Sequence, residues 1–241
     1  KIRILEVTSM KQYFLGIEFG STRIKAVLLD EKHAIVKSGD YTWKSSLENG
    51  VWTYHMEDVQ TGLRTAIRNL GELPGAVSAM GISGMMHGYL AFDKDWNLLA
   101  PFRTWQNTMT GEAAEQLTAE FGFNIPQRWS IAHLYQAVLN GEAHVKNIAH
   151  ITTLAGYVHY LLTGENVLGV GEASGMFPID SEALDYDAAM LEKFDALIAK
   201  YGFAWTARSV LPKVLTAGQA AGALTQAGST FLDGLLSAGI P

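Results

Sequence analysis

Three strand-forming runs follow one another closely at the start of the chain. Apolar and β-branched residues fill 13–19, 23–30 and 33–43, and only short polar turns join the runs. This close spacing favours an antiparallel meander, because a parallel connection needs a crossover of a dozen or more residues. The chain is therefore predicted to begin as an antiparallel sheet.

Helical periodicity becomes dominant further along the chain. Apolar residues recur at helical spacing within 55–73, where Gly71 marks the expected end of a helix. A buried strand is predicted at 76–83 and a hairpin at 88–99, with its turn at Asp93–Asn97. Further helices are predicted at 110–122, 130–142, 151–165 and 183–202. Residues 215–241 show no evident final element, and the order of elements indicates a mixed α/β domain.

Composition narrows the class of protein. Of the 241 residues, 48% are hydrophobic and 17% are charged, which is typical of a globular chain with a sizeable core. The net charge of −6 and the lack of a basic block argue against nucleic acid as a partner. No apolar run reaches the roughly 18 residues of a membrane helix, and the chain has no cysteine, so a cytoplasmic protein is expected. Residues 1–9 are interpreted as a leader or tag before a domain at 10–241.

The turn between the first two runs carries the first candidate site. Gly20, Ser21 and Thr22 form a tight turn, whose backbone N–H groups can converge on an anion. Glu18 would repel a bare phosphate, so its place beside this turn makes sense if a cation lies between them. Mg²⁺ commonly bridges a carboxylate to substrate phosphates. The alternative is an ordinary hairpin with an exposed glutamate.

Three later segments place polar or aromatic residues beside predicted elements. Met86 and His87 lie between the buried strand and the hairpin, next to Gly88. Trp105 and Asn107 come just before the helix at 110–122. Glu172 stands among small residues in an expected loop at 169–180.

The order and spacing of these segments resemble the N-terminal domain of the FGGY family of carbohydrate kinases, especially its xylulokinase-like members. The first strand and turn of that family read G-I-D-x-G-T, and its sugar-binding motif reads M-H-G. A helix ending L-T-G-E and a catalytic loop S-D-A-x-G-T follow. The matching segments here are 16–21, 86–88, 162–165 and 171–176, and the resemblance runs from about Tyr13 to the end of the chain.

The resemblance implies a fold and an activity. The fold would be ribonuclease-H-like, as in actin and hexokinase, with a central mixed sheet and helices on both sides. The activity would be transfer of a phosphoryl group from ATP, with Mg²⁺, to a hydroxyl of a ketopentose such as xylulose or of a related sugar or polyol. The chain would be the sugar-binding half, inactive alone and without the C-terminal nucleotide domain. A homodimer is one candidate assembly.

The resemblance also implies residue roles. Glu172 would be the catalytic base, and Met86, His87, Trp105 and Asn107 would bind the sugar. Glu18 would hold the metal, and the turn that follows it would hold phosphate. Simpler interpretations remain open for these positions: a structural histidine, a core tryptophan, an asparagine that caps a helix, and glutamates on a surface loop or hairpin.

Departures from the family pattern leave a second hypothesis open. The family usually has Asp where this chain has Glu18 and Glu172. Its W-N-D-x-R motif appears here as Trp105-Gln106-Asn107-Thr108-Met109, without the acid or the arginine. Because a carboxylate displaced by one methylene need not align with the same hydroxyl, these changes also fit a sugar-binding or sensor domain without catalysis.

Overall fold

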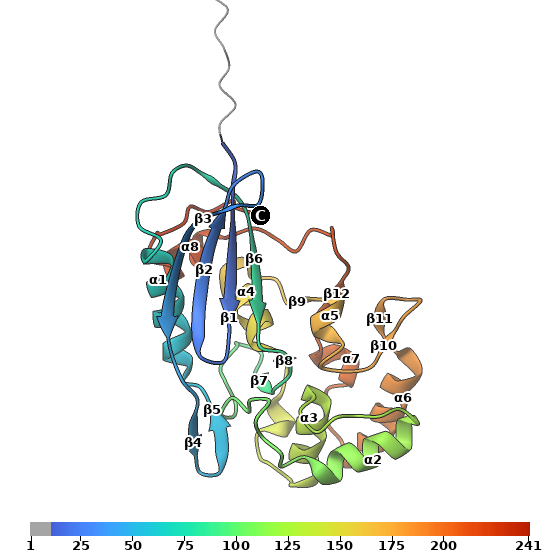
Figure 1. Cartoon of the computed structure of the whole chain (residues 1–241). Coiled ribbons are helices and arrows are strands. Elements are labelled where there is room, and N and C mark those ends of the chain that lie inside the picture. The colour runs from blue at the N-terminus through green and yellow to red at the C-terminus, as the bar shows by residue number, and fades with distance from the viewer. Residues whose placement is uncertain (1–10) are drawn as a thin grey trace, which may run out of the picture.

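A four-stranded mixed sheet forms one side of the molecule (Figure 1). The computed structural model describes residues 11–241, so the interpretation of residues 1–9 as a leader or tag lies outside the described residues. The strand order is β3-β2-β1-β6. Three strands form the predicted antiparallel meander, and the fourth runs parallel to β1. Their bounds are β1 Tyr13–Phe19, β2 Arg23–Leu29, β3 Ile35–Thr42 and β6 Val77–Gly84.

The two faces of this sheet differ in burial. Leu15, Ile17 and Phe19 of β1 are at most 2% exposed, whereas Gly16 and Glu18 between them are exposed. This alternation is expected for a strand with one face against the core. The sheet therefore has one buried face and one open face within residues 11–241.

The helices that cover the sheet lie on its buried face (Figure 1). Leu63 of α1 (Met56–Arg68) and Leu154 of α4 (Leu154–Thr163) belong to the same core as Leu15 and Ile17. The helix α8 (Gln226–Phe231) packs against α4. The fold class is confirmed as a mixed α/β domain, but the expectation of helices on both sides is not met in the described part of the chain.

A second core lies in the helical part, at the lower right of Figure 1. Its helices are α2 Gly111–Phe121, α3 Ser130–Leu139, α6 Ala188–Ile198 and α7 Ala207–Val210. The helix predicted over 183–202 begins later, at Ala188, because Asp187 accepts a hydrogen bond from the Met190 N–H and so acts as the N-cap. The preceding residues Asp185–Tyr186 form β11, which pairs with β10 (Ile179–Asp180).

Short elements connect the two cores. The helix predicted over 151–165 begins at Leu154, because Thr153 caps it and the preceding residues form a strand. It ends at Gly164 in the left-handed conformation, as predicted.

The expectation of a tail without a final element is wrong, since 215–241 contain α8 and the buried Leu232 and Leu236. The other short elements are β4 Ser46–Glu48, β5 Val51–Thr53, β7 Leu90–Phe92, β8 His150–Thr152, β9 Val167–Gly169, β12 Lys213–Leu215, α5 Val170–Ala173, η1 Val145–Asn147 and η2 Ala199–Tyr201.

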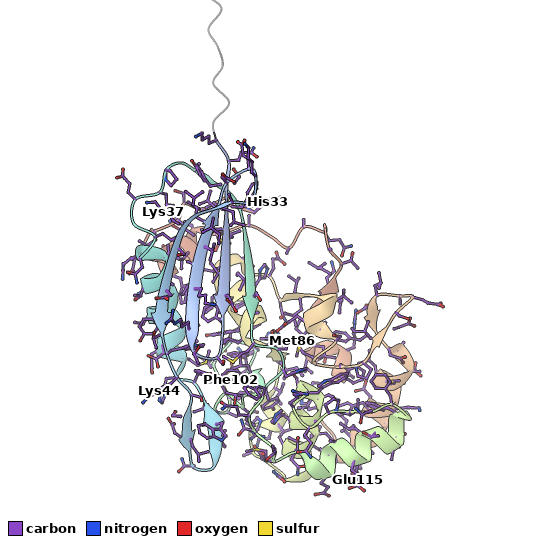
Figure 2. All side chains as sticks on the ribbon, viewed as in Figure 1. His33, Lys37, Lys44, Met86, Phe102 and Glu115 are labelled. Atoms are coloured by element: carbon purple, nitrogen blue, oxygen red, sulfur yellow. The ribbon has the colours of Figure 1, made fainter. Side chains whose placement is uncertain are left out.

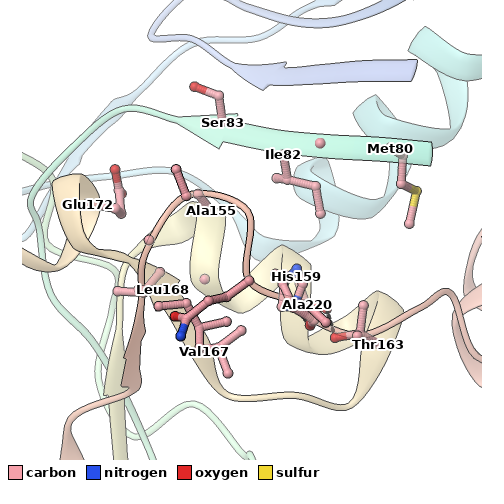
Figure 3. A pocket seen from close by; sticks show the side chains of 18 of the residues that line it. Met80, Ile82, Ser83, Ala155, His159, Thr163, Val167, Leu168, Glu172 and Ala220 are labelled. Carbon is pink, nitrogen blue, oxygen red and sulfur yellow. Dashed lines mark hydrogen bonds between the residues drawn. The ribbon is translucent and has the colours of Figure 1, made fainter. Parts of the chain in front are cut away.

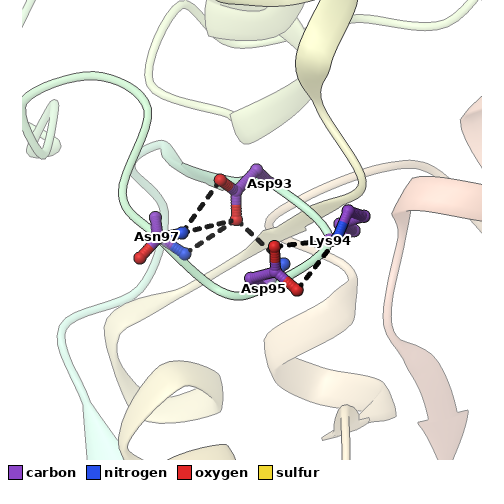
Figure 4. Close-up of polar contacts among 4 residues, drawn as sticks. All are labelled: Asp93, Lys94, Asp95 and Asn97. Carbon is purple, nitrogen blue, oxygen red and sulfur yellow. Dashed lines mark hydrogen bonds and ion pairs between the residues drawn. The ribbon is translucent and has the colours of Figure 1, made fainter.

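The predicted turn at Asp93–Asn97 is confirmed (Figure 4). The Asp93 carboxylate accepts the backbone N–H groups of Asp95 and Asn97, each at 2.9 Å, and also the Asn97 side-chain amide. Lys94 pairs with Asp95 at 2.8 Å. Since one carboxylate satisfies several donors of its own turn, this acidic cluster is explained by hairpin geometry.

Each edge of the sheet has a contact with another segment. At β6, the Met80 N–H donates to the Pro241 carbonyl at 2.8 Å. At β3, the Lys37 ammonium donates to the Glu72 carbonyl, and Figure 2 shows Lys37 beside this outer strand. No helix within residues 11–241 has the length and apolar character needed to cross a membrane.

Candidate functional site

Glu172 lies at one end of a cavity of about 660 Å³ (Figure 3). Residues of β6, α4 and β9 line this cavity, together with the segment 215–222. Glu172 itself belongs to the short helix α5, so the expectation that it stands in a loop is wrong. The helix presents the carboxylate toward a space that a small molecule can enter.

The surroundings of Glu172 favour its neutral form. Its Oε1 atom is buried and has no hydrogen-bond partner within residues 11–241. Burial raises the pKa of this carboxyl above its ordinary 4.5, and the Thr153 hydroxyl opposes the rise in part. A carboxylate with a raised pKa binds a proton more readily, which suits a general base.

His87 is held in one tautomer by a backbone carbonyl. Its Nδ1 lies 3.2 Å from the Gly175 oxygen. Since a carbonyl only accepts, Nδ1 carries the proton and Nε2 keeps a free lone pair. Burial lowers the pKa of His87, while the bond to Gly175 opposes this change and the Arg128 charge adds to it. The ring is therefore neutral at pH 7 and can accept a hydrogen bond from a hydroxyl.

Gly175 allows the Glu172 segment to approach Met86 and His87. A Cβ atom at this position would lie 2.8 Å from His87 Nδ1 and 3.2 Å from Met86 Cε. Gly175 also donates its N–H to the Glu172 carbonyl at 3.0 Å. The structure thus joins His87 to the turn that carries Glu172, and Figure 2 shows Met86 where the sheet meets the helical part.

Trp105 and Asn107 have different settings. Trp105 is 42% exposed, so the interpretation as a core tryptophan is wrong. Asn107 is 3% exposed, and its amide oxygen accepts the Trp52 N–H at 2.8 Å. Its amide nitrogen donates to the Trp52 and Thr104 carbonyls. Asn107 does not cap α2, whose N-cap is Thr110, and these three bonds favour a structural role over sugar contact.

Glu18 lies on the open face of the sheet. Its side chain is 51% exposed and pairs with Lys25, the Nζ atom being 3.2 Å from Oε2. Glu18 does not line the cavity at Glu172, but Ser83, its neighbour across the parallel strand pair, does. Ser83 of β6 therefore links Glu18 to the cavity that Glu172 lines.

The turn after Glu18 presents donors rather than acceptors. The Trp43 indole N–H donates to the Gly20 carbonyl and the Tyr54 hydroxyl to the Ser21 carbonyl, both at 2.7 Å. The N–H groups of Ser21 and Thr22 have no partner within residues 11–241. Free N–H groups beside a carboxylate fit a phosphate with a bridging cation.

Gly20 lies close to the backbone of its own turn. A Cβ atom at Gly20 would lie 3.1 Å from the Arg23 carbonyl oxygen and 3.6 Å from Glu18 Oε1. No group of three or more His, Asp or Glu side chains in the described part of the chain forms a metal cluster. A cation at Glu18 would therefore take most of its ligands from water or from a substrate, which is the usual coordination of Mg²⁺.

The sequence analysis missed two contacts around Glu172. The Thr153 hydroxyl opposes the rise in the pKa of the Glu172 carboxyl. The Gly175 carbonyl accepts a hydrogen bond from His87 Nδ1. The glycine of the S-D-A-x-G-T pattern could have indicated a close approach at Gly175. No comparable pattern marks Thr153, which became significant only because β8 places it at the start of α4.

Comparison with known proteins decides the family. The family model for the FGGY family of carbohydrate kinases, N-terminal domain, matches residues 13–241. The chain belongs to this family. A glycerol kinase from Thermococcus gammatolerans is 25% identical over 202 residues, covering 77% of this chain and 41% of the relative. A xylulose kinase from Klebsiella pneumoniae is 25% identical over 198 residues, covering 76% of this chain and 40% of the relative.

Solved structures share the fold of this FGGY domain. A xylulose kinase from Rhodospirillum rubrum has a TM-score of 0.80 at 20% identity, over 95% of this chain and 48% of that protein. A gluconate kinase from Lactobacillus acidophilus has a TM-score of 0.79 at 18% identity, over 95% of this chain and 46% of that protein. These structures confirm the actin- and hexokinase-like fold. The chain spans less than half the length of the relatives it matches.

Proposed function

We propose that this chain is the sugar-binding half of a kinase that uses ATP and Mg²⁺ to phosphorylate a hydroxyl of a sugar or polyol. The observation that carries the proposal is the link between Glu172 and His87. A partly buried carboxyl with a raised pKa and a neutral imidazole with a free Nε2 share the turn at Gly175. A base and a hydroxyl acceptor side by side suit the positioning of an alcohol for transfer.

Each residue then has a defined role. Glu172 accepts the proton of the attacking hydroxyl, which becomes more nucleophilic as the proton leaves. His87 accepts a hydrogen bond from a neighbouring hydroxyl through Nε2. The exposed Met86 and Trp105 offer apolar surface to the C–H face of the sugar. Asn107 contributes mainly by holding the backbone at Trp52.

The turn after β1 supplies the nucleotide end of the site. Glu18 would hold Mg²⁺, and the N–H groups of Ser21 and Thr22 beside Gly20 would hold phosphate oxygens. When bound, Mg²⁺ neutralises phosphate charge during transfer. A second domain, beyond the part homologous to residues 13–241, would hold the rest of ATP, so we expect this chain alone to hydrolyse ATP at no useful rate.

The sugar is the least constrained part of the proposal. The relatives include glycerol kinases and xylulose kinases, and the uncharged Asn107 and Met109 replace an acid and an arginine of the family motif. A panel of ketopentoses and polyols, with ATP consumption measured on the full-length protein, tests it. We expect one of these compounds to stimulate ATP consumption. If none does, the result contradicts the proposed kinase activity on these compounds.

A sugar-binding sensor without catalysis is the second candidate. The glutamates at positions 18 and 172, where the family usually has aspartate, favour it. Calorimetric titration of the full-length protein with the same panel separates the two functions. Saturable sugar binding without turnover at any Mg²⁺ or ATP concentration would indicate the sensor, and turnover would exclude it.

A further inference from the structure

The first turn of α3 contacts both segments that form the site. Ser130, the first residue of α3, donates its hydroxyl to the Gly88 carbonyl at 2.5 Å. The next residue, Ile131, donates its N–H to the Met176 carbonyl at 3.1 Å. One helical turn is therefore bonded to the residue after His87 and to the segment that follows Glu172.

These bonds close a ring. The Gly88 N–H donates to the Arg128 carbonyl at 3.2 Å, which ties Gly88 twice to the segment before α3. His87 Nδ1 bonds to Gly175, and Gly175 is followed directly by Met176. The three segments 87–88, 128–131 and 175–176 thus hold one another, and the only side chains in these bonds are those of His87 and Ser130.

The backbone at His87 needs such support. His87 has a φ of +69° and Gly88 a φ of +91°. The left-handed region disfavours a residue with a Cβ atom, and such strain persists only where surrounding contacts hold it. Ser130 is fully buried, so its hydroxyl is protected from exchange with solvent.

We propose that Ser130 is a positioning residue that sets the orientation of His87 relative to Glu172. The inference rests on the proposed function for its kinetic consequence, but its structural consequence is independent of that function. Without the hydroxyl, the Gly88 carbonyl is left buried without this donor, and the His87 backbone relaxes from its left-handed conformation. The bond from His87 to Gly175 then weakens, while Ile131 still holds the Glu172 segment.

A matched pair of serines makes the test specific. Ser229 is also buried, at 7% exposure, and its hydroxyl donates to the Leu236 carbonyl at 2.7 Å in the sheet core. S130A and S229A remove the same chemical group from two buried sites. We expect comparable losses of thermal stability, because each leaves a carbonyl without its donor.

Two readouts separate positioning from simple destabilisation, both on the full-length protein. Nitrogen NMR of the histidine rings without substrate should show that S130A lowers the fraction of His87 protonated at Nδ1, whereas S229A leaves it unchanged. In steady-state kinetics with the sugar that supports turnover, S130A should raise KM by about tenfold with less than a threefold change in kcat. S229A should leave both constants within about twofold.

The outcomes are distinguishable. Unchanged His87 tautomer and unchanged KM in S130A would overturn the inference. If no sugar supports turnover, the proposed function fails and the tautomer measurement alone decides about Ser130. If S130A does not fold, S130C keeps the approximate volume and weakens the donor, so it should shift the tautomer in the same direction by a smaller amount. A folded S130C protein with the wild-type tautomer would then overturn the inference.

Discussion

Glu18 and Glu172 are the same residue type in opposite surroundings. Glu18 is half exposed on an open sheet face and pairs with Lys25, whereas Glu172 has a buried oxygen without a partner. The exposed Glu18 carboxylate can bind a metal ion in place of water and Lys25 at a small cost in free energy. A carboxylate short of hydrogen bonds gains by taking up a proton. We propose that burial and hydrogen-bond partners, rather than residue type, suit Glu18 to hold a metal ion and Glu172 to act as a base.

The largest expected effect is the loss of kcat on substitution of Glu172. In the full-length enzyme, Glu172→Gln keeps the size of the side chain and removes its basicity, so kcat should fall by about 10²–10⁴-fold with little change in sugar affinity. Steady-state kinetics checks this. Glu182→Gln, at an exposed site in the turn between β10 and β11, is the control and should behave as wild type. A kcat within about threefold of wild type for Glu172→Gln would remove Glu172 from the mechanism.

Glu18→Gln should act on the metal instead. A neutral amide is a weaker ligand for a hard cation, so the Mg²⁺ concentration for half-maximal rate should rise by about 10–100-fold. Sugar affinity without ATP should stay nearly intact, because the sugar is expected near His87 and Glu172. Titration of Mg²⁺ at saturating sugar measures the first quantity. An unchanged Mg²⁺ dependence would make Glu18 an ordinary hairpin residue.

The raised pKa of Glu172 predicts an acid limb in the pH profile. A base acts when deprotonated, so kcat/KM should fall by about tenfold per pH unit below the pKa of the free enzyme. Because burial raises that pKa, the limb should begin above pH 4.5. The residual activity of Glu172→Gln should lack this limb. If the limb persists in that variant, another group titrates.

The smallest expected effects are on stability and have opposite signs. The folded pKa of Glu172 lies above its unfolded value, so its favourable contribution is present below pH 4.5 and is lost as the pH rises through the folded pKa. At pH 7, Glu172→Gln should therefore raise Tm, with roughly 2–4 °C for each kcal/mol gained, and the gain should vanish in acid. Glu18→Gln removes only an exposed ion pair worth about 0–1 kcal/mol. Thermal melts of the 241-residue chain at several pH values test this contrast, and a loss of stability in Glu172→Gln at pH 7 would contradict it.

Local patterns in the sequence predicted much of the fold. The meander, β6, α1, α2, α3 and the turn at Asp93 follow from periodicity and turn residues, and all are present. Two helices were predicted too long because short strands precede them. Asp185–Tyr186 and His150–Thr152 are strands only because distant partners pair with them. Such pairings are tertiary effects that local propensity does not encode.

The candidate site divides in the same way. Residue types and order were enough to nominate Glu172, His87 and Glu18. They could not show that the Asn107 side chain would form hydrogen bonds with the Trp52 backbone. Nor could they show that the Gly175 carbonyl would fix the His87 tautomer. Both facts depend on segments more than 50 residues apart in the chain meeting in the folded protein.

The edges of the sheet have a consequence for solubility. Unpaired N–H and C=O groups at a sheet edge are templates for another strand, and exposed apolar side chains add to the risk of aggregation. At β3, Ile35 is 71% exposed, but Lys37 places a charge on the same strand. At β6, the Pro241 carbonyl accepts a hydrogen bond from the Met80 N–H. Proline has no N–H of its own with which to extend a β-ladder. Lys37 on one edge strand and Pro241 beside the other therefore disfavour the addition of a further strand, and so reduce the risk of aggregation.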